Sequence, residues 1–207
     1  RQSMKYAVLV GDGMADYPLE ELGGRTPLEA ARTPNMDYIA KCGSLGRAKT
    51  IPDNMSPASD VANIAILGYD PKQYYTGRGP LEAANLGVEV EDDDVAFRCN
   101  LITAAADILT DYSAGHISSE EAKILIEFIG EKLGTNKIRF YPGVSYRHLT
   151  VVKRGHEQHL EYLKCIPPHD IRDKNISKNL PKGDGAEIII KLMQESRALL
   201  EKHEINL

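Results

Sequence analysis

The stretch that decides the fold is YAVLVGDG, residues 6–13. Its apolar run from Tyr6 to Val10 is followed by Asp12, which lies between two glycines. A short apolar run that ends in glycines is typical of a buried strand leading into a tight loop. We therefore predict a core strand over residues 5–10. Asp12 then lies at its carboxyl end, where open α/β sheets place their ligands.

Two helices are predicted after this strand. Thr33-Pro34 and Ser56-Pro57 each combine an N-cap residue with a proline at the first helical position. The first helix is expected to stop near Gly43 and the second near Gly68, where a C-terminal cap belongs. A strand followed by helices indicates an α/β layer with a parallel sheet.

The later part of the chain has a different pattern. Residues 95–102 alternate, which predicts a strand with Arg98 and Asn100 on one face. A Ser118-x-x-Glu121 capping box opens a predicted helix over 118–134. Two strand pieces are expected in 138–153, irregular structure in 154–183, and a last helix from Asp184.

These patterns suggest three segments. Residues 1–80 form the first part of a ligand-binding α/β domain, 81–183 form a second lobe, and 184–207 form a helix that returns toward the first domain. We expect Met4 to be the native first residue.

Composition limits the classes of function. The net charge is −5, so no basic field attracts nucleic acid or an anionic membrane. The sequence has no run of about 18 apolar residues, and no glycine-rich nucleotide motif. Three scattered cysteines argue against a disulfide framework and predict buried or semi-buried thiols in a reducing cytoplasm.

Two residues near the predicted sheet edge are candidates for chemistry. Asp12 is suited to bind a hard divalent cation, although a turn aspartate explains it equally well. Ser59 falls in the first turn of a predicted helix, where unpaired N–H groups bind phosphate and favour negative charge on oxygen. The alternative is a serine that only caps the helix.

The remaining candidates suit anion binding. Arg78 lies between glycines that allow a close approach to a ligand, and it is otherwise an exposed loop arginine. Arg98 and Asn100 bind a carboxylate or face water. Arg147 and His148 lie within the second of the two strand pieces expected in 138–153. They are candidates for substrate contact, and the alternative is that they lie on a face of the strand exposed to water. His116 follows DYSAG, residues 111–115.

Together these motifs resemble the archaeal-type cofactor-independent phosphoglycerate mutases of the alkaline phosphatase superfamily. The similarity runs from Met4 nearly to residue 207, and it rests on the order of the motifs rather than on any single one. The motifs are VGDGM (10–14), TPNM (33–36), SDVAN (59–63), LGYDP (67–71), TGRGPLEA (76–83), AFRCNL (96–101), DYSAGHI (111–117), FYPGVSYRH (140–148) and PPHDI (167–171).

The resemblance implies an alkaline-phosphatase-like parallel-sheet domain, incomplete here, with an inserted α/β cap domain. It implies two divalent metal ions (Mn, Mg, Zn or Co), no bisphosphoglycerate and no nucleotide. Asp12 and Ser59 would be ligands of one metal, and Ser59 would become phosphorylated while 3-phosphoglycerate and 2-phosphoglycerate interconvert. Contacts to the phosphoglycerate would come from Arg78, Arg98, Asn100, His116, Arg147 and His148.

Two departures from the family pattern stand out. Ala58 precedes the serine where the family commonly has glycine, and the family chain continues beyond 207 residues, with its other metal ligands in that part. We therefore expect these residues to be inactive alone and to form a homo-oligomer or rely on the cap. The alternatives are a phosphatase or sulfatase of the superfamily, another phosphomutase, or a non-catalytic substrate-binding fragment.

Overall fold

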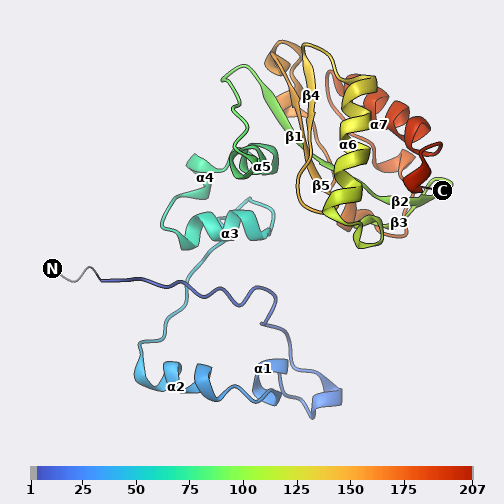
Figure 1. Cartoon of the computed structure of the whole chain (residues 1–207). Coiled ribbons are helices and arrows are strands. Elements are labelled where there is room, and N and C mark those ends of the chain that lie inside the picture. The colour runs from blue at the N-terminus through green and yellow to red at the C-terminus, as the bar shows by residue number, and fades with distance from the viewer. Residues whose placement is uncertain (1–3, 207) are drawn as a thin grey trace. The chain divides into compact units, whose positions relative to one another are not determined.

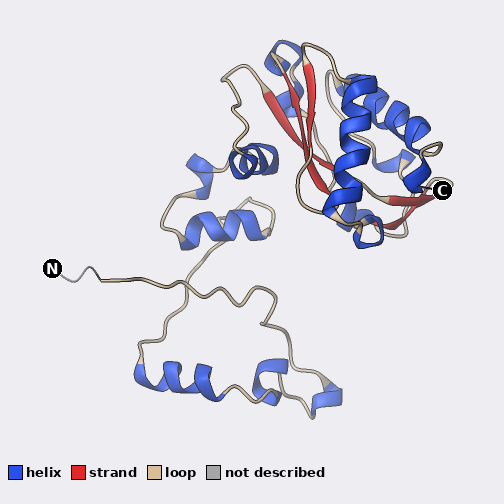
Figure 2. Cartoon of the chain, in the orientation of Figure 1, coloured by secondary structure: helices blue, strands red, loops and turns tan. Residues whose placement is uncertain are grey.

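The structure is a computed structural model that describes residues 4–206. Residues 1–3, which we expected to precede the native start at Met4, lie outside the described residues, as does residue 207. Contacts between Cα atoms divide the chain into two units, Arg1–Tyr75 and Thr76–Leu207. Figures 1 and 2 trace both units.

The first unit is built from short helices joined by extended segments. In chain order these are η1 (Glu20–Leu22), α1 (Pro27–Ala30), α2 (Pro34–Cys42), α3 (Ser59–Ile66) and α4 (Pro71–Tyr74). Thr26 opens α1 with a capping box to Glu29, and Asp70 caps α4 by accepting from the Lys72 N–H.

The predicted strand over residues 5–10 is wrong. These residues have no regular secondary structure, and the named strands of the described chain all lie after residue 75 (Figure 2). A strand needs a neighbour for its backbone hydrogen bonds, and the described part of this unit supplies none. Leu9 is accordingly 87% exposed, where a core strand would have buried it.

The second unit contains two antiparallel sheets. The larger has the strand order β1 (Val95–Asn100), β5 (Arg147–Val152), β4 (Ile138–Tyr141). The smaller pairs β2 (Thr103–Ala105) with β3 (Ile108–Asp111). In the larger sheet Val95 pairs with Val152 and Asn100 with Arg147. The predicted strand at 95–102 and the pair of strands around Pro142-Gly143 are confirmed.

Helices cover both faces of the larger sheet. α5 (Arg78–Leu86) packs through Ala83 against Leu149 and Val151 of β5. On the other face lie α6 (Ser119–Leu133) and α7 (Ala186–Leu200), side by side (Figure 1). α5 approaches β1 closely at Gly79, where a Cβ atom would fall within 1.8 Å of the Ala96 carbonyl oxygen. A glycine is therefore required there for α5 to hold its place on the sheet.

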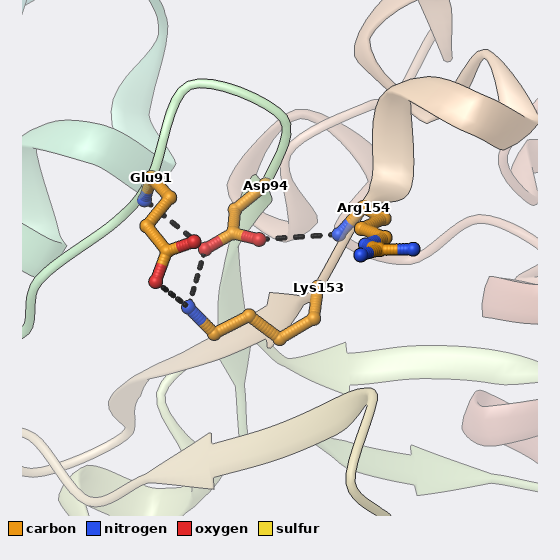
Figure 3. Close-up of polar contacts among 4 residues, drawn as sticks. All are labelled: Glu91, Asp94, Lys153 and Arg154. Carbon is orange, nitrogen blue, oxygen red and sulfur yellow. Dashed lines mark hydrogen bonds and ion pairs between the residues drawn. The ribbon is translucent and has the colours of Figure 1, made fainter.

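An ion pair fastens the start of β1 to the end of β5 (Figure 3). The Asp94 carboxylate accepts from Lys153 Nζ at 2.7 Å and from the backbone N–H groups of Glu91 and Arg154. Burial alone would raise the pKa of Asp94. The hydrogen bonds from Lys153, Glu91 and Arg154 together outweigh that effect, so the pKa of Asp94 is lowered. Only 2% of the Asp94 side chain is exposed, so this pair is part of the packed structure.

The other helices follow the sequence signals with small shifts. α6 begins within the predicted Ser118–Glu121 capping box, with Ser118 as its N-cap, and its stripe of Ala122, Leu125 and Ile129 is buried. α7 begins two residues after Asp184, with Gly185 as its N-cap. The predicted irregular segment holds the short 3₁₀ turns η3 (Gly155–Gln158), η4 (Leu160–Tyr162), η5 (Pro168–Ile171) and η6 (Ser177–Asn179). A 3₁₀ turn precedes α6, η2 (Ala114–His116), and another follows α7, η7 (Glu204–Asn206).

The expected combination of helices and sheets is confirmed, but the sheets of the described residues are antiparallel, so the expected parallel sheet is not found among them. All three cysteines are free, as expected, but Cys42 and Cys165 are exposed, so the expectation of buried thiols is wrong for these two. Across residues 4–206, no helix combines the length and the apolar character that crossing a membrane requires.

Candidate functional site

The first candidate group joins two residues that are far apart in sequence. Ser59 Oγ donates a hydrogen bond of 3.0 Å to Oδ2 of Asp12. Asp12 lies beside Gly13, which has φ +72°, and Ser59 is the first residue of α3. From the sequence we expected both residues near one edge of a sheet. In the structure they are hydrogen-bonded to each other, although the expected strand over residues 5–10 is not formed.

Ser59 does not act as a helix cap. The N-cap of α3 is Ala58, which makes no side-chain cap hydrogen bond, and the Ser59 hydroxyl is bound to Asp12 instead. The helix begins two residues later than Ser56-Pro57 predicted, because its N-cap is Ala58 rather than Ser56. This places Ser59 in the first turn, among backbone N–H groups that have no partner within the helix. The capping alternative for Ser59 is therefore wrong.

Asp12 and Ser59 have the donor atoms that a hard divalent cation prefers, a carboxylate and a hydroxyl. Two donors do not complete a metal site. Over residues 4–206, no three or more His, Cys, Asp or Glu side chains gather closely enough to hold a metal ion. The pair fits one part of such a site and not the whole of it.

The second candidate group gathers positive charge on the α5 face of the larger sheet. Arg98 Nε lies 3.9 Å from Glu82 Oε2 of α5, and 18% of the Arg98 side chain is exposed. Burial lowers the pKa of Arg98, and the positive charges of Arg78 and Arg147 lower it further, while Glu82 raises it. The Nε atom is buried and has no hydrogen-bond partner. The positive charges of Arg78 and Arg147 act on Arg98, and a buried donor without a hydrogen-bond partner beside them is an arrangement suited to an anion.

Asn100 and Arg147 extend this face. They are paired across β1 and β5. Asn100 follows Arg98 by two residues in β1, so the two side chains lie on the same face of the strand. Arg147 is exposed and precedes Leu149 by two residues in β5. It therefore lies on the same face of the sheet as Leu149, the face that packs against α5. The structure therefore brings Arg78, Arg98, Asn100 and Arg147 to one side of the sheet.

His148 lies on the opposite face. It is 0% exposed, and burial lowers its pKa to about 4, so the imidazole is neutral at pH 7. Its Nδ1 accepts from the Gly143 N–H at 3.0 Å, and its buried Nε2 has no partner. The structure thus separates His148 from Arg147, and substrate contact by His148 stays a prediction that its burial does not favour.

His116 lies in an unusual turn between β3 and α6. Ala114, Gly115 and His116 have φ values of +51°, +68° and +57°. Each non-glycine residue in this left-handed region costs about 1–2 kcal/mol. Hydrogen bonds from the Ser113 backbone and side chain, and then from the Gly115 backbone, lower the pKa of Asp111, whose carboxylate closes the turn. The turn leaves His116 exposed.

Sequence reasoning missed two acidic residues in these groups, Glu82 and Asp111. Both lie inside motifs that were recognised, TGRGPLEA and DYSAGHI, but neither received a role. Glu82 is four residues after Arg78, a helical spacing that places the two on one face of α5. That spacing was the available signal for Glu82.

Comparisons with known proteins agree on one family. Residues 40–206 match the family model of 2,3-bisphosphoglycerate-independent phosphoglycerate mutase. The chain is 57% identical over 204 residues to the protein of that name from Methanosarcina mazei, covering 99% of this chain and 51% of the relative. The chain spans about half the length of the relatives it matches.

Two solved structures are similar. The cofactor-independent phosphoglycerate mutase of Thermoplasma acidophilum shares 29% identity at a TM-score of 0.52, over 94% of this chain and 51% of that one. A protein of Pyrococcus horikoshii shares 31% identity at a TM-score of 0.62, over 94% and 44%.

Proposed function

The chain belongs to the family of 2,3-bisphosphoglycerate-independent phosphoglycerate mutases, and on that premise we propose that the protein interconverts 3-phosphoglycerate and 2-phosphoglycerate through a phosphoserine at Ser59. The observation that carries the proposal is the 3.0 Å hydrogen bond from Ser59 Oγ to Asp12, made at the first residue of α3. The family's independence of bisphosphoglycerate fits a phosphoryl group held by the enzyme itself.

The proposed reaction has two balanced transfers. In the first, a bond forms between Ser59 Oγ and phosphorus while the bond from phosphorus to the glycerate oxygen breaks. The hydroxyl proton leaves Oγ along its hydrogen bond to Asp12, and the glycerate oxygen gains a proton. In the second, a bond forms between the other glycerate oxygen and phosphorus while the bond from phosphorus to Ser59 Oγ breaks. The attacking glycerate hydroxyl gives up its proton, and Asp12 returns to Ser59 Oγ the proton that it accepted in the first transfer. The backbone N–H groups at the start of α3 stabilise the negative charge on the transferred group.

Asp12 and Ser59 are the residues of this chain that would hold a divalent cation, and the remaining ligands would come from outside residues 1–207. When bound, such a cation would activate the serine oxygen and neutralise charge on the phosphoryl group. Hard oxygen donors favour Mn²⁺ or Mg²⁺ over softer ions. This choice of metal is part of the proposal.

The glycerate carboxylate is proposed to bind the arginines of the second unit. The buried Arg98 Nε, which has no hydrogen-bond partner, supports this, because an unsatisfied donor costs free energy until an acceptor arrives. Arg78, Arg147 and Asn100 would share the anion, and His116 would contact the substrate from its exposed turn. Holding glycerate between the two transfers prevents its loss and favours isomerisation over hydrolysis.

A trapping experiment tests the proposal. The full-length protein that contains this chain is mixed with 3-phosphoglycerate and Mn²⁺, quenched in acid, and analysed by mass spectrometry of the peptide around Ser59. We expect one added phosphoryl group on Ser59, absent in Ser59→Ala and retained in Ser56→Ala, a matched serine just before the helix. Formation of 2-phosphoglycerate separates a mutase from a phosphatase, which releases only inorganic phosphate. An unmodified Ser59 during turnover would overturn the proposal.

A further inference from the structure

The turn before α6 is held by one carboxylate. Oδ1 of Asp111 accepts from the Ser113 N–H at 2.8 Å and from Ser113 Oγ at 2.7 Å. Oδ2 accepts from the Gly115 N–H at 2.8 Å. Ser113 Oγ in turn accepts from the His116 N–H at 3.3 Å, and Ser113 is 1% exposed. Both oxygens of Asp111 are therefore committed to the turn that ends at His116.

This turn has a backbone that a chain does not adopt without support. Ala114, Gly115 and His116 are left-handed in succession, with His116 at φ +57°. Gly115 suits that region, but the residues on either side of it carry a Cβ and do not. The hydrogen bonds that Asp111 accepts bridge the turn and oppose its relaxation. Loss of one of them would let His116 move to an ordinary backbone conformation.

A second set of contacts ties the same turn to the two residues just before Arg147, which are Ser145 and Tyr146. Ser145 Oγ donates to the Ile117 carbonyl at 2.8 Å, and the Ser145 N–H donates to Ser119 Oγ at 3.0 Å. The rings of Tyr112 and Tyr146 meet edge to face, with centroids 5.9 Å apart. Ser145 itself is left-handed, at φ +53°. The residues next to His116 and to Arg147 are thus held against each other.

We propose that Asp111 is the positioning residue that fixes His116 for contact with the substrate anion. The inference rests on the proposed function, which makes His116 a substrate contact. Asp111 touches no reacting atom in this account. Its role is to hold a strained turn so that the imidazole of His116 meets the substrate anion without reordering on binding.

Asparagine is the most informative substitution for Asp111. Its amide has the shape of the carboxylate but only one acceptor oxygen, so Asp111→Asn keeps the contacts of Ser113 or that of Gly115 and loses the other. The matched control is Asp107→Asn. Asp107 also accepts from nearby backbone and side-chain donors, those of Ser177 and Asn175, but it holds a different loop.

The test is a double-mutant cycle on the full-length protein, with 3-phosphoglycerate as substrate. We expect His116→Ala and Asp111→Asn each to raise KM about fivefold or more, with kcat changed less than about twofold. Asp111→Asn should add no further increase in the His116→Ala background, because the residue that it positions is gone. Asp107→Asn should leave KM unchanged.

The possible failures are distinguishable. If His116→Ala leaves KM unchanged, the proposed contact at His116 fails and the inference fails with it. If only Asp111→Asn has no effect, or if it raises KM equally in both backgrounds, the inference alone is overturned. Should Asp111→Asn not fold, Gly115→Ala replaces it in the cycle. A Cβ there meets no atom within 4 Å, so that change acts only through the left-handed backbone at φ +68°.

Discussion

Ser59 Oγ lies 3.0 Å from Oδ2 of Asp12, although 47 residues separate the two along the chain. Neither residue lies in a packed core, because among residues 4–75 the buried ones are Val61 and Pro71. A hydrogen bond between exposed groups contributes little to folding. The role proposed for this pair is accordingly in the reaction and not in folding stability.

The first prediction concerns this pair. In the full-length protein, Ser59→Ala and Asp12→Asn should each lower kcat by roughly 10³-fold or more. The double variant should be little worse than Ser59→Ala, since the two side chains act as one unit. Steady-state conversion of 3-phosphoglycerate measures this. Asp16→Asn is the control, because the hydrogen bond that Asp16 accepts within residues 4–206 comes from its neighbour Tyr17. Fully additive losses would contradict the coupling.

The second prediction concerns recognition of the carboxylate. Arg98→Ala should raise KM for phosphoglycerate about 10–100-fold, the equivalent of the roughly 1.5–3 kcal/mol that a hydrogen bond to a charged group contributes. Ser59-dependent hydrolysis of a small phosphate ester without a carboxylate should be nearly unchanged. Arg139→Ala, at an exposed position of β4, serves as the control. An equal loss on both substrates would argue against carboxylate binding at Arg98.

The third prediction is a pH dependence of stability that comes from Asp94. Its pKa is lowered in the folded protein, so its stabilising effect is present above the unfolded value, near 3.9. That effect is lost as the pH falls through the lower folded value. Asp94→Asn should therefore reduce the free energy of unfolding at pH 7 by about 1.5–3 kcal/mol and by less at pH 3. Urea unfolding at both pH values measures this, and a penalty of the same size at both would refute the ionic contribution.

The sequence predicted local structure better than it predicted pairing. The capping box at Ser118 and Glu121 and the alternation around Arg98 act over a few residues, and both predictions are confirmed. The strand at 5–10 was wrong because a strand is stabilised by a neighbour, which an apolar pattern cannot supply.

In the candidate site, too, the sequence indicated single residues better than it indicated which residues lie close together. Motifs identified Asp12, Ser59 and Arg98, but the partners Glu82 and Asp111 became visible only through their distances. The burial of His148 was equally hidden, because the strand pattern did not reveal that helices cover both faces of the sheet.

The fourth prediction concerns the core of the second unit. Leu149 is 0% exposed between Ala83 and Val151, so Leu149→Ala should cost about 2–5 kcal/mol of stability through lost burial and the cavity left behind. Leu45→Ala removes the same atoms from a side chain that is 82% exposed, and should cost less than about 0.5 kcal/mol. Thermal unfolding of the two variants compares them directly. Equal losses would mean that this cluster does not stabilise the unit.

The last prediction is that residues 1–207 alone do not catalyse the reaction. Asp12 and Ser59 supply two oxygen donors, and the described residues hold no cluster of three or more metal-binding side chains. A carboxylate and a neutral hydroxyl bind a divalent cation weakly and cannot position a second one. Apolar side chains are also widely exposed in the first unit, among them Tyr6, Leu9 and Leu45, which favours self-association.

The corresponding assay adds excess Mn²⁺ to the purified 207-residue chain and follows conversion of 3-phosphoglycerate, with sedimentation to report the oligomeric state. We expect no turnover above that of Ser59→Ala, together with species larger than a monomer. Self-association without activity would fit an incomplete site rather than an unfolded chain, provided that circular dichroism shows the helices of the second unit. Turnover close to that of the full-length protein would instead require a complete metal site within these residues, and the pair at Asp12 and Ser59 would then need ligands that the structure does not bring near it.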